Sequence, residues 1–381
     1  MLFWLASYPR SGNTFVRVLI KQLYGISTYD LHEPDPCRPE YEHIIGNARL
    51  DAPIAALQRD ERYHIVKTHN LPEEDYPAIY LVRDGRDALV SFARFVLPPE
   101  HADNRDEYLA LLRQLIEGTG SYGGWSGNVR AWMARRTTTV VVRFDDLIKS
   151  PLDELRRAMA TIGMKAPEAA AMNLPTFGDL QRLGPHFFRK GRTGAWREEM
   201  PDELHLLFWR RHGDTMRALG YRDGEPALEE IAGNPIGLDE SVRFGIGGAG
   251  YAGLGEGWGE AEEWGTWSVG RRASLHVVVG RDHSFPLDVS LGYRSFVEGE
   301  RALLVTCRAA GREISSWTCT VAGWRGTQRI TIPLEAVTAE GVVKLEFEIS
   351  NPRSPAELGL GQDTRQLGIG IESMRVASSP N

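Results

Sequence analysis

The chain contains few cysteines and no long run of apolar residues. Its three cysteines, Cys37, Cys307 and Cys319, are too few and too widely spaced for a disulfide framework or a thiolate metal site. No stretch approaches the roughly 20 apolar residues that a membrane-spanning helix requires. The apolar run at residues 1–6 lacks a basic leader and does not resemble a signal peptide. These absences predict a cytoplasmic protein without a membrane span.

The chain also lacks an excess of basic over acidic residues. The 381 residues carry a net charge of −7, which argues against a general nucleic-acid binder, because binding to a phosphate backbone needs a surplus of Lys and Arg. Only six of the 44 basic residues are lysines, and two of these, Lys67 and Lys190, lie in candidate anion-binding motifs. With 42% hydrophobic and 25% charged residues, the composition is that of a globular protein long enough for two domains.

The first 225 residues alternate short apolar runs with segments of helical periodicity. This alternation predicts βα units and a parallel sheet flanked by helices. Strands are expected at residues 2–7, 64–67, 79–82 and 138–144, and helices at residues 14–23, 84–95, 107–117, 129–136, 152–161 and 202–219.

The composition changes after residue 225. Residues 245–265 are rich in glycine, and short apolar runs separated by turn signals follow them, which predicts an antiparallel sandwich. These strands are expected at residues 273–279, 287–291, 302–307, 329–334, 342–349 and 368–376. We therefore predict a P-loop-like α/β domain at residues 1–225, a linker at 226–240 and a mostly antiparallel β-sandwich domain at 241–381.

The first predicted strand leads directly into a loop of small and polar residues, Tyr8-Pro9-Arg10-Ser11-Gly12-Asn13-Thr14-Phe15, where a helix begins. A strand, a small-residue loop and a helix start together direct backbone N–H groups and the helix dipole at an anion. Gly12 permits close approach of the backbone, and Arg10 adds a fixed positive charge. The P-loop consensus with its Gly-Lys pair is absent, so the loop alone is equally compatible with an ordinary βα turn.

Three further polar clusters follow predicted strands or precede the last predicted helix. The second strand ends in Lys67-Thr68-His69, and parallel strands place their functional groups at this carboxyl end. The third strand runs into Arg83-Asp84-Gly85-Arg86-Asp87 and a helix that carries Ser91. A basic loop, Arg189-Lys190-Gly191-Arg192, precedes the last helix. Arginine at a helix start opposes the helix dipole and therefore favours a nearby anion.

The order of these four clusters resembles that in the nucleotide-dependent sulfotransferase family, over residues 1–222. The resemblance implies transfer of a sulfuryl group from 3′-phosphoadenosine-5′-phosphosulfate (PAPS) to an acceptor hydroxyl, with adenosine 3′,5′-bisphosphate (PAP) as the nucleotide product. The residues that it implies for the 5′-phosphosulfate are Arg10, Ser11, Gly12, Asn13, Thr14 and Phe15. Those that it implies for the 3′-phosphate are Arg83, Ser91, Arg189, Lys190 and Gly191.

The same resemblance places the family's catalytic histidine at His69. By analogy with phosphoryl transfer, in-line sulfuryl transfer depends mostly on positioning and charge stabilisation. Arg10 and Lys67 supply that stabilisation in this interpretation, and His69 takes the proton of the acceptor hydroxyl as general base. The sulfuryl group carries a single negative charge, so no metal is required and none is predicted.

Three positions depart from the family pattern. Arg10 stands where a lysine is usual, which keeps the charge but presents a planar fork. Phe15 replaces a tryptophan and Phe144 replaces a tyrosine that the family often has. These changes affect contacts with the adenine more than contacts with the phosphates.

A second interpretation is a P-loop-type nucleotide kinase that uses ATP and magnesium. The apolar run at residues 140–142 ends in Arg143-Phe144-Asp145-Asp146, which resembles a strand followed by a metal-binding acid. A kinase also needs a loop lysine, which this chain lacks. Binding of PAP without magnesium would favour the sulfotransferase, and magnesium-dependent binding of ATP would favour the kinase.

The C-terminal region loosely resembles β-sandwich modules of bacterial glycan-assembly enzymes, through the segment Trp264-Gly265-Thr266-Trp267-Ser268 and residues 363–369. The resemblance implies a saccharide or glycosylated acceptor. A small phenol or a lipid alcohol as acceptor stays open, as do a non-catalytic carbohydrate-binding role and a homo-oligomer formed through the sandwich. Residues 248–253 match G-x-G-x-x-G, but glycines continue where a helix should begin, so no dinucleotide site is predicted there.

Overall fold

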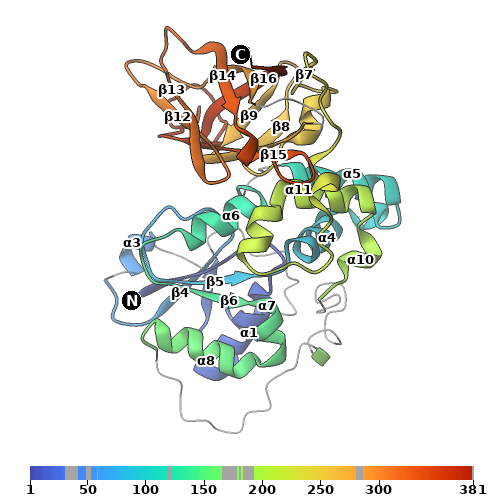
Figure 1. Ribbon diagram of the computed structural model, residues 1–381. Coiled ribbons are helices and arrows are strands. Elements are labelled where there is room, and N and C mark those ends of the chain that lie inside the picture. The colour runs from blue at the N-terminus through green and yellow to red at the C-terminus, as the bar shows by residue number, and fades with distance from the viewer. Residues whose placement is uncertain are drawn as a thin grey trace. The chain divides into compact units, whose positions relative to one another are not determined.

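The chain folds into two compact units (Figure 1). The computed structural model describes residues 1–30, 42–48, 53–57, 59–118, 120, 122–164, 178–179, 182, 193–279 and 286–379. Unit 1 comprises Met1–Leu112 and Ser121–Pro201, and unit 2 comprises Arg113–Gly120 and Asp202–Asn381.

Unit 1 is built around a parallel sheet with the strand order β3-β2-β4-β1-β5-β6. Strand β1 lies between β4 and β5, with Ala6 aligned to Thr68 and Ser7 aligned to Leu81. The carboxyl ends of these three strands therefore meet at one edge, so the loops that follow them are neighbours. The strands are β1 (Leu2–Ser7), β2 (Thr28–Asp30), β3 (Asn47–Ala48), β4 (His64–Thr68), β5 (Ala78–Val82) and β6 (Thr139–Arg143).

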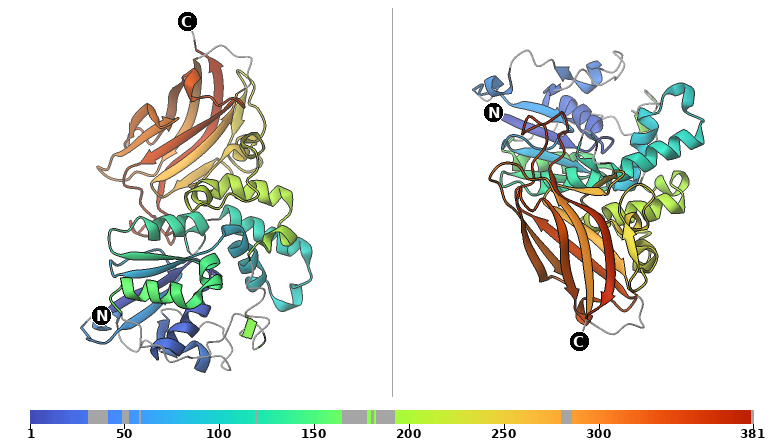
Figure 2. Two further views of the ribbon diagram at one scale, coloured as in Figure 1. Left: turned by 60° about the horizontal axis from the view of Figure 1, so that its bottom comes forward. Right: turned by 90° about the horizontal axis from the view of Figure 1, so that it is seen from above.

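Helices cover both faces of this sheet. Figure 1 shows α6 on one face and α1, α7 and α8 on the other, and the left view of Figure 2 agrees. The central strands are buried on both faces, as the continuous apolar runs predict. The helices are α1 (Asn13–Tyr24), α2 (Glu42–Ile45), α3 (Ile54–Leu57), α4 (Gly85–Val96), η2 (Pro99–His101), α5 (Arg105–Glu117), α6 (Gly124–Met133), α7 (Phe144–Lys149), α8 (Pro151–Thr161) and α10 (Trp196–Glu199). The end of α5 belongs to unit 2.

Unit 2 is an antiparallel sandwich whose two sheets face each other (Figure 2). One sheet has the order β10-β15-β12-β13, and the other has the order β14-β11-β16-β9-β8 with β7 paired to β16. The strands are β7 (Ser241–Arg243), β8 (Trp258–Ala261), β9 (Thr266–Val269), β10 (Arg272–Val278), β11 (Leu287–Ser295), β12 (Leu303–Ala309), β13 (Arg312–Cys319), β14 (Arg325–Ile332), β15 (Val342–Ile349) and β16 (Leu367–Ser378).

The core of unit 2 lies between the two sheets. Leu275, Val305 and Phe347 from one sheet and Val289 and Ile371 from the other are almost completely buried there. Burial of each such side chain contributes about 1.5–3 kcal/mol. The predicted fold class, a helix-flanked parallel sheet followed by a mostly antiparallel sandwich, is confirmed.

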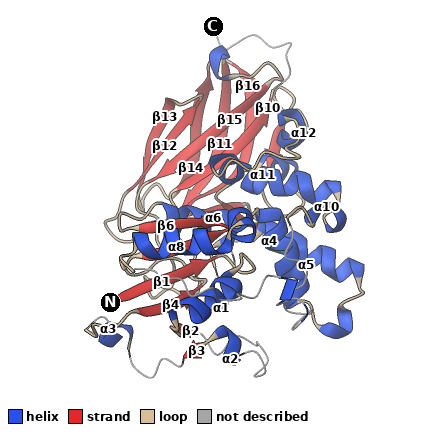
Figure 3. Cartoon of the chain, turned by 90° about the horizontal axis from the view of Figure 1, so that it is seen from below, coloured by secondary structure: helices blue, strands red, loops and turns tan. Residues whose placement is uncertain are grey.

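Two helices of unit 2 pack against its strands. In α11 (Asp202–Ala218), Asp214 accepts a hydrogen bond from Lys344 Nζ at 2.6 Å, and Thr215 donates two bonds to Glu256. Figure 3 shows α12 (Leu228–Ala232) beside β10, where Ala232 packs against Val278. Short turns of 3₁₀ helix, η3 (Ala249–Gly253) and η4 (Leu334–Ala336), complete the unit. Helices α11 and α12 belong to the same compact unit as the sandwich. The domain limits 1–225, 226–240 and 241–381 stay a prediction.

Within the described part of the chain, no helix combines the length and the apolar character that crossing a membrane demands.

Candidate functional site

The loop after β1 adopts a backbone conformation that its glycine makes possible. Gly12 has φ 97° and is the N-cap of α1, and an added Cβ would lie 2.8 Å from Cδ2 of Phe144. Arg10 also has a positive φ, 65°, which is uncommon for a residue with a side chain. Backbone strain of this kind, on the order of 1 kcal/mol, is frequent at functional sites. The loop is therefore held in one conformation at the amino end of a helix.

The loop presents a buried polar group with no protein partner. Ser11 is buried, and its Oγ makes no hydrogen bond to any described residue. Leaving such a group unsatisfied costs about 1–3 kcal/mol. Thr14 is half-buried in the first turn of α1, and Phe15 packs in the hydrophobic core. A hydroxyl donor at a helix start matches the predicted anion site.

Arg83 and Ser91, from a later part of the sequence, contact Arg10 of this loop. Arg83, directly after β5, donates from Nη1 to the carbonyl oxygen of Arg10 at 3.0 Å. Arg10 donates from Nε to Ser91 Oγ of α4 at 3.2 Å. The guanidinium group of Arg83 lies over the ring of Phe144 at 4.5 Å, next to Gly12. We call Arg10, Ser11, Gly12, Arg83 and Ser91 the anion cradle.

His69 follows β4 at the same edge of the sheet. Its Nδ1 lies 2.8 Å from the carbonyl oxygen of Ser7, the last residue of β1. A carbonyl oxygen only accepts, so Nδ1 donates, and the neutral ring carries its lone pair on Nε2. Asn128 donates to the carbonyl oxygen of His69 at 2.8 Å, and the ring of Tyr122 meets the imidazole edge to face. These contacts fix both the tautomer and the orientation of the imidazole.

Lys67 is held by a carboxylate. Its Nζ lies 3.0 Å from Asp30 Oδ2, and both side chains are only 7% exposed. The guanidinium group of Arg17 lies 3.9 Å from the same Asp30 oxygen. Because Asp30 is the last residue of β2, it fixes Lys67 at the carboxyl edge of the sheet. The sequence pattern did not identify Asp30 or Arg17 as parts of the site.

The first turn of α4 binds the chain that follows the basic loop. The carboxylate of Asp87 accepts hydrogen bonds from the backbone N–H groups of Gly194, at 2.8 Å, and Trp196, at 3.0 Å. Arg86 lies over the ring of Trp196 at 3.9 Å. Burial raises the pKa of the Asp87 carboxyl, while Arg83 lowers it. The predicted site residues Arg189, Lys190 and Gly191 lie outside the described residues; in the sequence, Gly191 is three positions before Gly194.

Together these groups can bind a polyanion and accept a proton. The cradle offers two guanidinium groups, two serine hydroxyl groups and the amino end of α1. His69 presents a ring nitrogen at the same edge. Trp125, which lies in the glycine-rich segment at residues 123–127, is wholly buried. No group of three or more His, Cys, Asp or Glu side chains within the described ranges is arranged to hold a metal ion.

Comparison with known proteins identifies a family for residues 2–220. The family model described as "Sulfotransferase domain" matches residues 2–220. The chain is similar to Sulfotransferase 1E1 of Rattus norvegicus, with 27% identity over 244 residues that cover 55% of this chain and 82% of the rat protein. It is 27% identical over 222 residues to the 3-alpha-hydroxysteroid sulfotransferase of Cavia porcellus, covering 50% and 75% of the two chains. The crystal structure of mouse sulfotransferase SULT7A1 complexed with PAP is similar, with 19% sequence identity and a TM-score of 0.42. The similarity covers 59% of this chain and 88% of the mouse chain.

Proposed function

The chain belongs to the sulfotransferase family, and we propose that it transfers a sulfuryl group from PAPS to an acceptor hydroxyl by in-line displacement. The observation that carries the proposal is the convergence of Arg10, Arg83 and Ser91 on one loop beside His69. PAPS supplies the activated sulfuryl group when bound. The mouse relative of known structure is a complex with PAP.

The cradle residues fit the two anionic ends of such a nucleotide. The Ser11 hydroxyl group has no described partner and lies at the start of α1, where it suits the 5′-phosphosulfate. Arg83 and Ser91 suit the 3′-phosphate, with Arg189, Lys190 and Gly191 as predicted partners. A side chain at Gly12 would collide with Phe144, so the loop keeps its backbone accessible only with glycine there.

His69 acts as the general base in this proposal. The bond from Nδ1 to Ser7 places the lone pair of the neutral ring on Nε2, and in this proposal Nε2 takes the proton of the acceptor hydroxyl. Asn128 holds the backbone of His69, and Tyr80 donates to Asn128 Oδ1 at 2.9 Å. Base catalysis of this kind contributes roughly 10²–10⁴-fold to the rate.

Arg10 and Lys67 stabilise the charge that develops on the transferred group and on the departing oxygen. Asp30 holds Lys67 in place through one of its three N–H groups. Fixed cations in a site that excludes water need no reorganisation during the reaction. The alternative of a magnesium-dependent kinase is less well supported, because the loop after β1 carries Arg10 and no lysine.

The acceptor is proposed at the level of a class. A saccharide or glycosylated acceptor, as in bacterial glycan modification, rests on the sandwich and its tryptophans Trp264 and Trp267, whose rings lie 5.0 Å apart. A lipid alcohol is the second candidate, because one relative is named a 3-alpha-hydroxysteroid sulfotransferase. A small phenol, the cytoplasmic location and a homo-oligomer stay predictions.

An acceptor panel tests the proposal. The full chain is incubated with ³⁵S-labelled PAPS and a saccharide, a phenol or a sterol, and transfer of label is measured. We expect transfer to at least one hydroxyl class, with no requirement for magnesium. If no class is labelled while the chain hydrolyses ATP in a magnesium-dependent manner, the proposal is wrong.

A further inference from the structure

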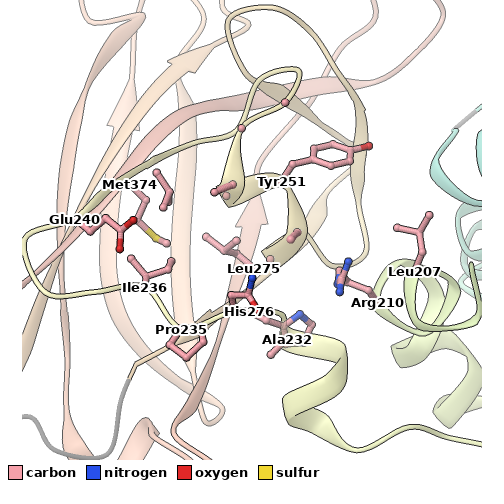
Figure 4. Close-up of a pocket in the computed structure, with 18 of the residues that line it drawn as sticks. Leu207, Arg210, Ala232, Pro235, Ile236, Glu240, Tyr251, Leu275, His276 and Met374 are labelled. Atoms are coloured by element: carbon pink, nitrogen blue, oxygen red, sulfur yellow. The ribbon is translucent and has the colours of Figure 1, made fainter. Parts of the chain in front are cut away.

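The glycine-rich segment at residues 248–253, which the sulfotransferase function does not use, lines a cavity of about 650 Å³ (Figure 4). All the residues that line this cavity belong to unit 2. The segment forms η3, and a Cβ at Gly248 would lie 2.2 Å from the carbonyl oxygen of Arg243. Glycine is therefore required for this close packing, and the volume lies in the range of small-molecule sites.

The wall of the cavity is mostly apolar. In Figure 4, Ile236 and Met374 lie on one side, Leu207 lies on the other, and Leu275 lies between them. Leu275 and Met374 are almost completely buried and belong to the core of the sandwich. This surface suits an aliphatic or ring-shaped body rather than a free ion.

Arg210 is a cavity-lining cation for which no ion pair is found among the described residues. Arg210 donates from Nε to the carbonyl oxygen of Ile231 at 2.7 Å. Its neighbour Arg211 is 4% exposed and lies over the ring of Tyr251 at 4.7 Å. The guanidinium nitrogens of Arg211 have no hydrogen-bond partner in the described part of the chain. Burial, together with the charge of Arg211, lowers the pKa of Arg210.

The carboxylates that line the same cavity already have partners. Glu117 lies 3.7 Å from Arg113 Nη1, and Glu240 accepts from the backbone N–H of Gly237 at 3.1 Å. Arg113 also pairs with Glu203. Glu117 also lies near Arg211: burial raises the pKa of the Glu117 carboxyl, and the charge of Arg211 lowers it. Arg210 has no such carboxylate among the described residues, and a partly buried cation is costly without a counter-charge, so an anion bound at Arg210 would stabilise it.

A buried imidazole provides a second polar contact. His276 lines the cavity, is 6% exposed, and its Nδ1 has no hydrogen-bond partner among the described residues. Burial and the nearby Lys344 keep the ring neutral at pH 7. A neutral imidazole offers one donor and one acceptor to a ligand.

We propose that this cavity binds an amphiphilic organic anion, with its carboxylate or sulfate-ester group at Arg210 and its apolar body against Leu275, Ile236 and Met374. No residue of the anion cradle lines the cavity, so the proposal does not depend on sulfuryl transfer. Arg210 determines that the ligand is an anion, and the apolar wall determines that the rest of the ligand is apolar.

The test is calorimetric titration of the full chain with three probes of equal chain length: octanoate, octyl sulfate and octanol. We expect both anions to bind at one site and octanol to bind at least tenfold more weakly. Arg210→Gln should weaken both anions roughly 10–100-fold, because a charge-assisted hydrogen bond is lost. Arg210→Lys should recover part of the loss, and octanol should be insensitive to either variant.

Two further variants separate binding from folding. Ala252 is an exposed residue at the cavity, and Ala252→Trp should block all three probes while leaving Arg210 in place. The matched control is Arg353→Gln, which removes a surface arginine of the same unit that pairs with Glu357. Equal affinity of octanol and octanoate, or anion binding that survives both Arg210→Gln and Ala252→Trp, would overturn the proposal. So would the absence of saturable binding by either anion.

Discussion

The anion cradle of unit 1 and the cavity of unit 2 handle positive charge differently. In unit 1, Arg83 and Lys67 are directed by the chain itself, through the carbonyl oxygen of Arg10 and the carboxylate of Asp30. In unit 2, the one hydrogen-bond partner of Arg210 within the described ranges is the carbonyl oxygen of Ile231, and Arg211 lies against an aromatic ring. The difference suggests that the cradle is organised before its ligand arrives, whereas the cavity gains its counter-charge from the ligand.

The largest expected effect separates catalysis from binding at the cradle. His69→Ala should lower turnover with PAPS by roughly 10²–10⁴-fold while PAP affinity changes less than threefold, because the imidazole acts on the acceptor proton. Steady-state rates and PAP titration measure the two effects. His101→Ala, at an exposed histidine of the same unit, is the control. Turnover unchanged in His69→Ala would remove the base assignment.

A pH series distinguishes the two units through their histidines. Burial, with a smaller effect of Lys344, lowers the pKa of His276 from 6.5 to about 4. The unfolded chain therefore binds a proton that the folded chain does not between pH 6.5 and pH 4, and stability falls as the pH falls through that window. The loss is about 3 kcal/mol.

Thermal unfolding of the wild type and of His276→Gln at several pH values measures this loss. Between pH 7 and pH 4, the free energy of unfolding of the wild type should fall by about 3 kcal/mol more than that of His276→Gln. His101 of unit 1 has a raised pKa because of Glu107, so its contribution has the opposite sign and fades as the pH rises. If the difference in free energy of unfolding between the wild type and His276→Gln does not change with pH, burial does not lower the pKa of His276.

Arg83→Gln tests the cation that reaches across the cradle. We expect PAP to bind roughly 10–100-fold more weakly, since a charge-assisted contact to phosphate is lost along with the bond to the Arg10 carbonyl. Calorimetry with PAP measures the change. Arg105→Gln, an exposed arginine in the same unit, should leave the affinity intact. Equal losses in both variants would point to general charge and not to the cradle.

Asp87→Asn tests the anchor that holds the chain after the basic loop. An amide can accept only one of the two backbone bonds from Gly194 and Trp196. We expect PAP affinity to fall about tenfold, with the rate at saturating PAPS little changed. Asp103→Asn, at an exposed position, is the control. If the rate falls while PAP affinity holds, Asp87 does not position the nucleotide site.

The sequence predicted the site best where the functional residues lie in short contiguous segments directly after a strand. Strands β1, β4 and β5 lie within one residue of the predicted limits, because continuous apolar runs form the buried centre of the sheet. The motifs after these strands are short and contiguous, so their residues could be named in advance. Asp30 could not be named, because only the pairing of β2 with β4 brings it to Lys67.

Other elements gave weak or misleading patterns. The helix predicted at residues 129–136 spans Gly124–Met133, because glycines at 123, 124 and 127 weaken the helical pattern where the helix begins. Strand β13 was missed, since most of its side chains are partly or fully exposed and no apolar alternation marks it. The cavity of unit 2 combines residues from Arg113 to Met374, and no local pattern indicates that combination.

Titration of the full chain with PAP in the presence of EDTA tests the central claim most directly, which is that the loops at one edge of the unit 1 sheet form a metal-independent site for an adenosine bisphosphate. We predict saturable binding of PAP at one site, unchanged when magnesium is added, and weaker binding of ATP. Binding of ATP that requires magnesium, with no measurable binding of PAP, would contradict the account.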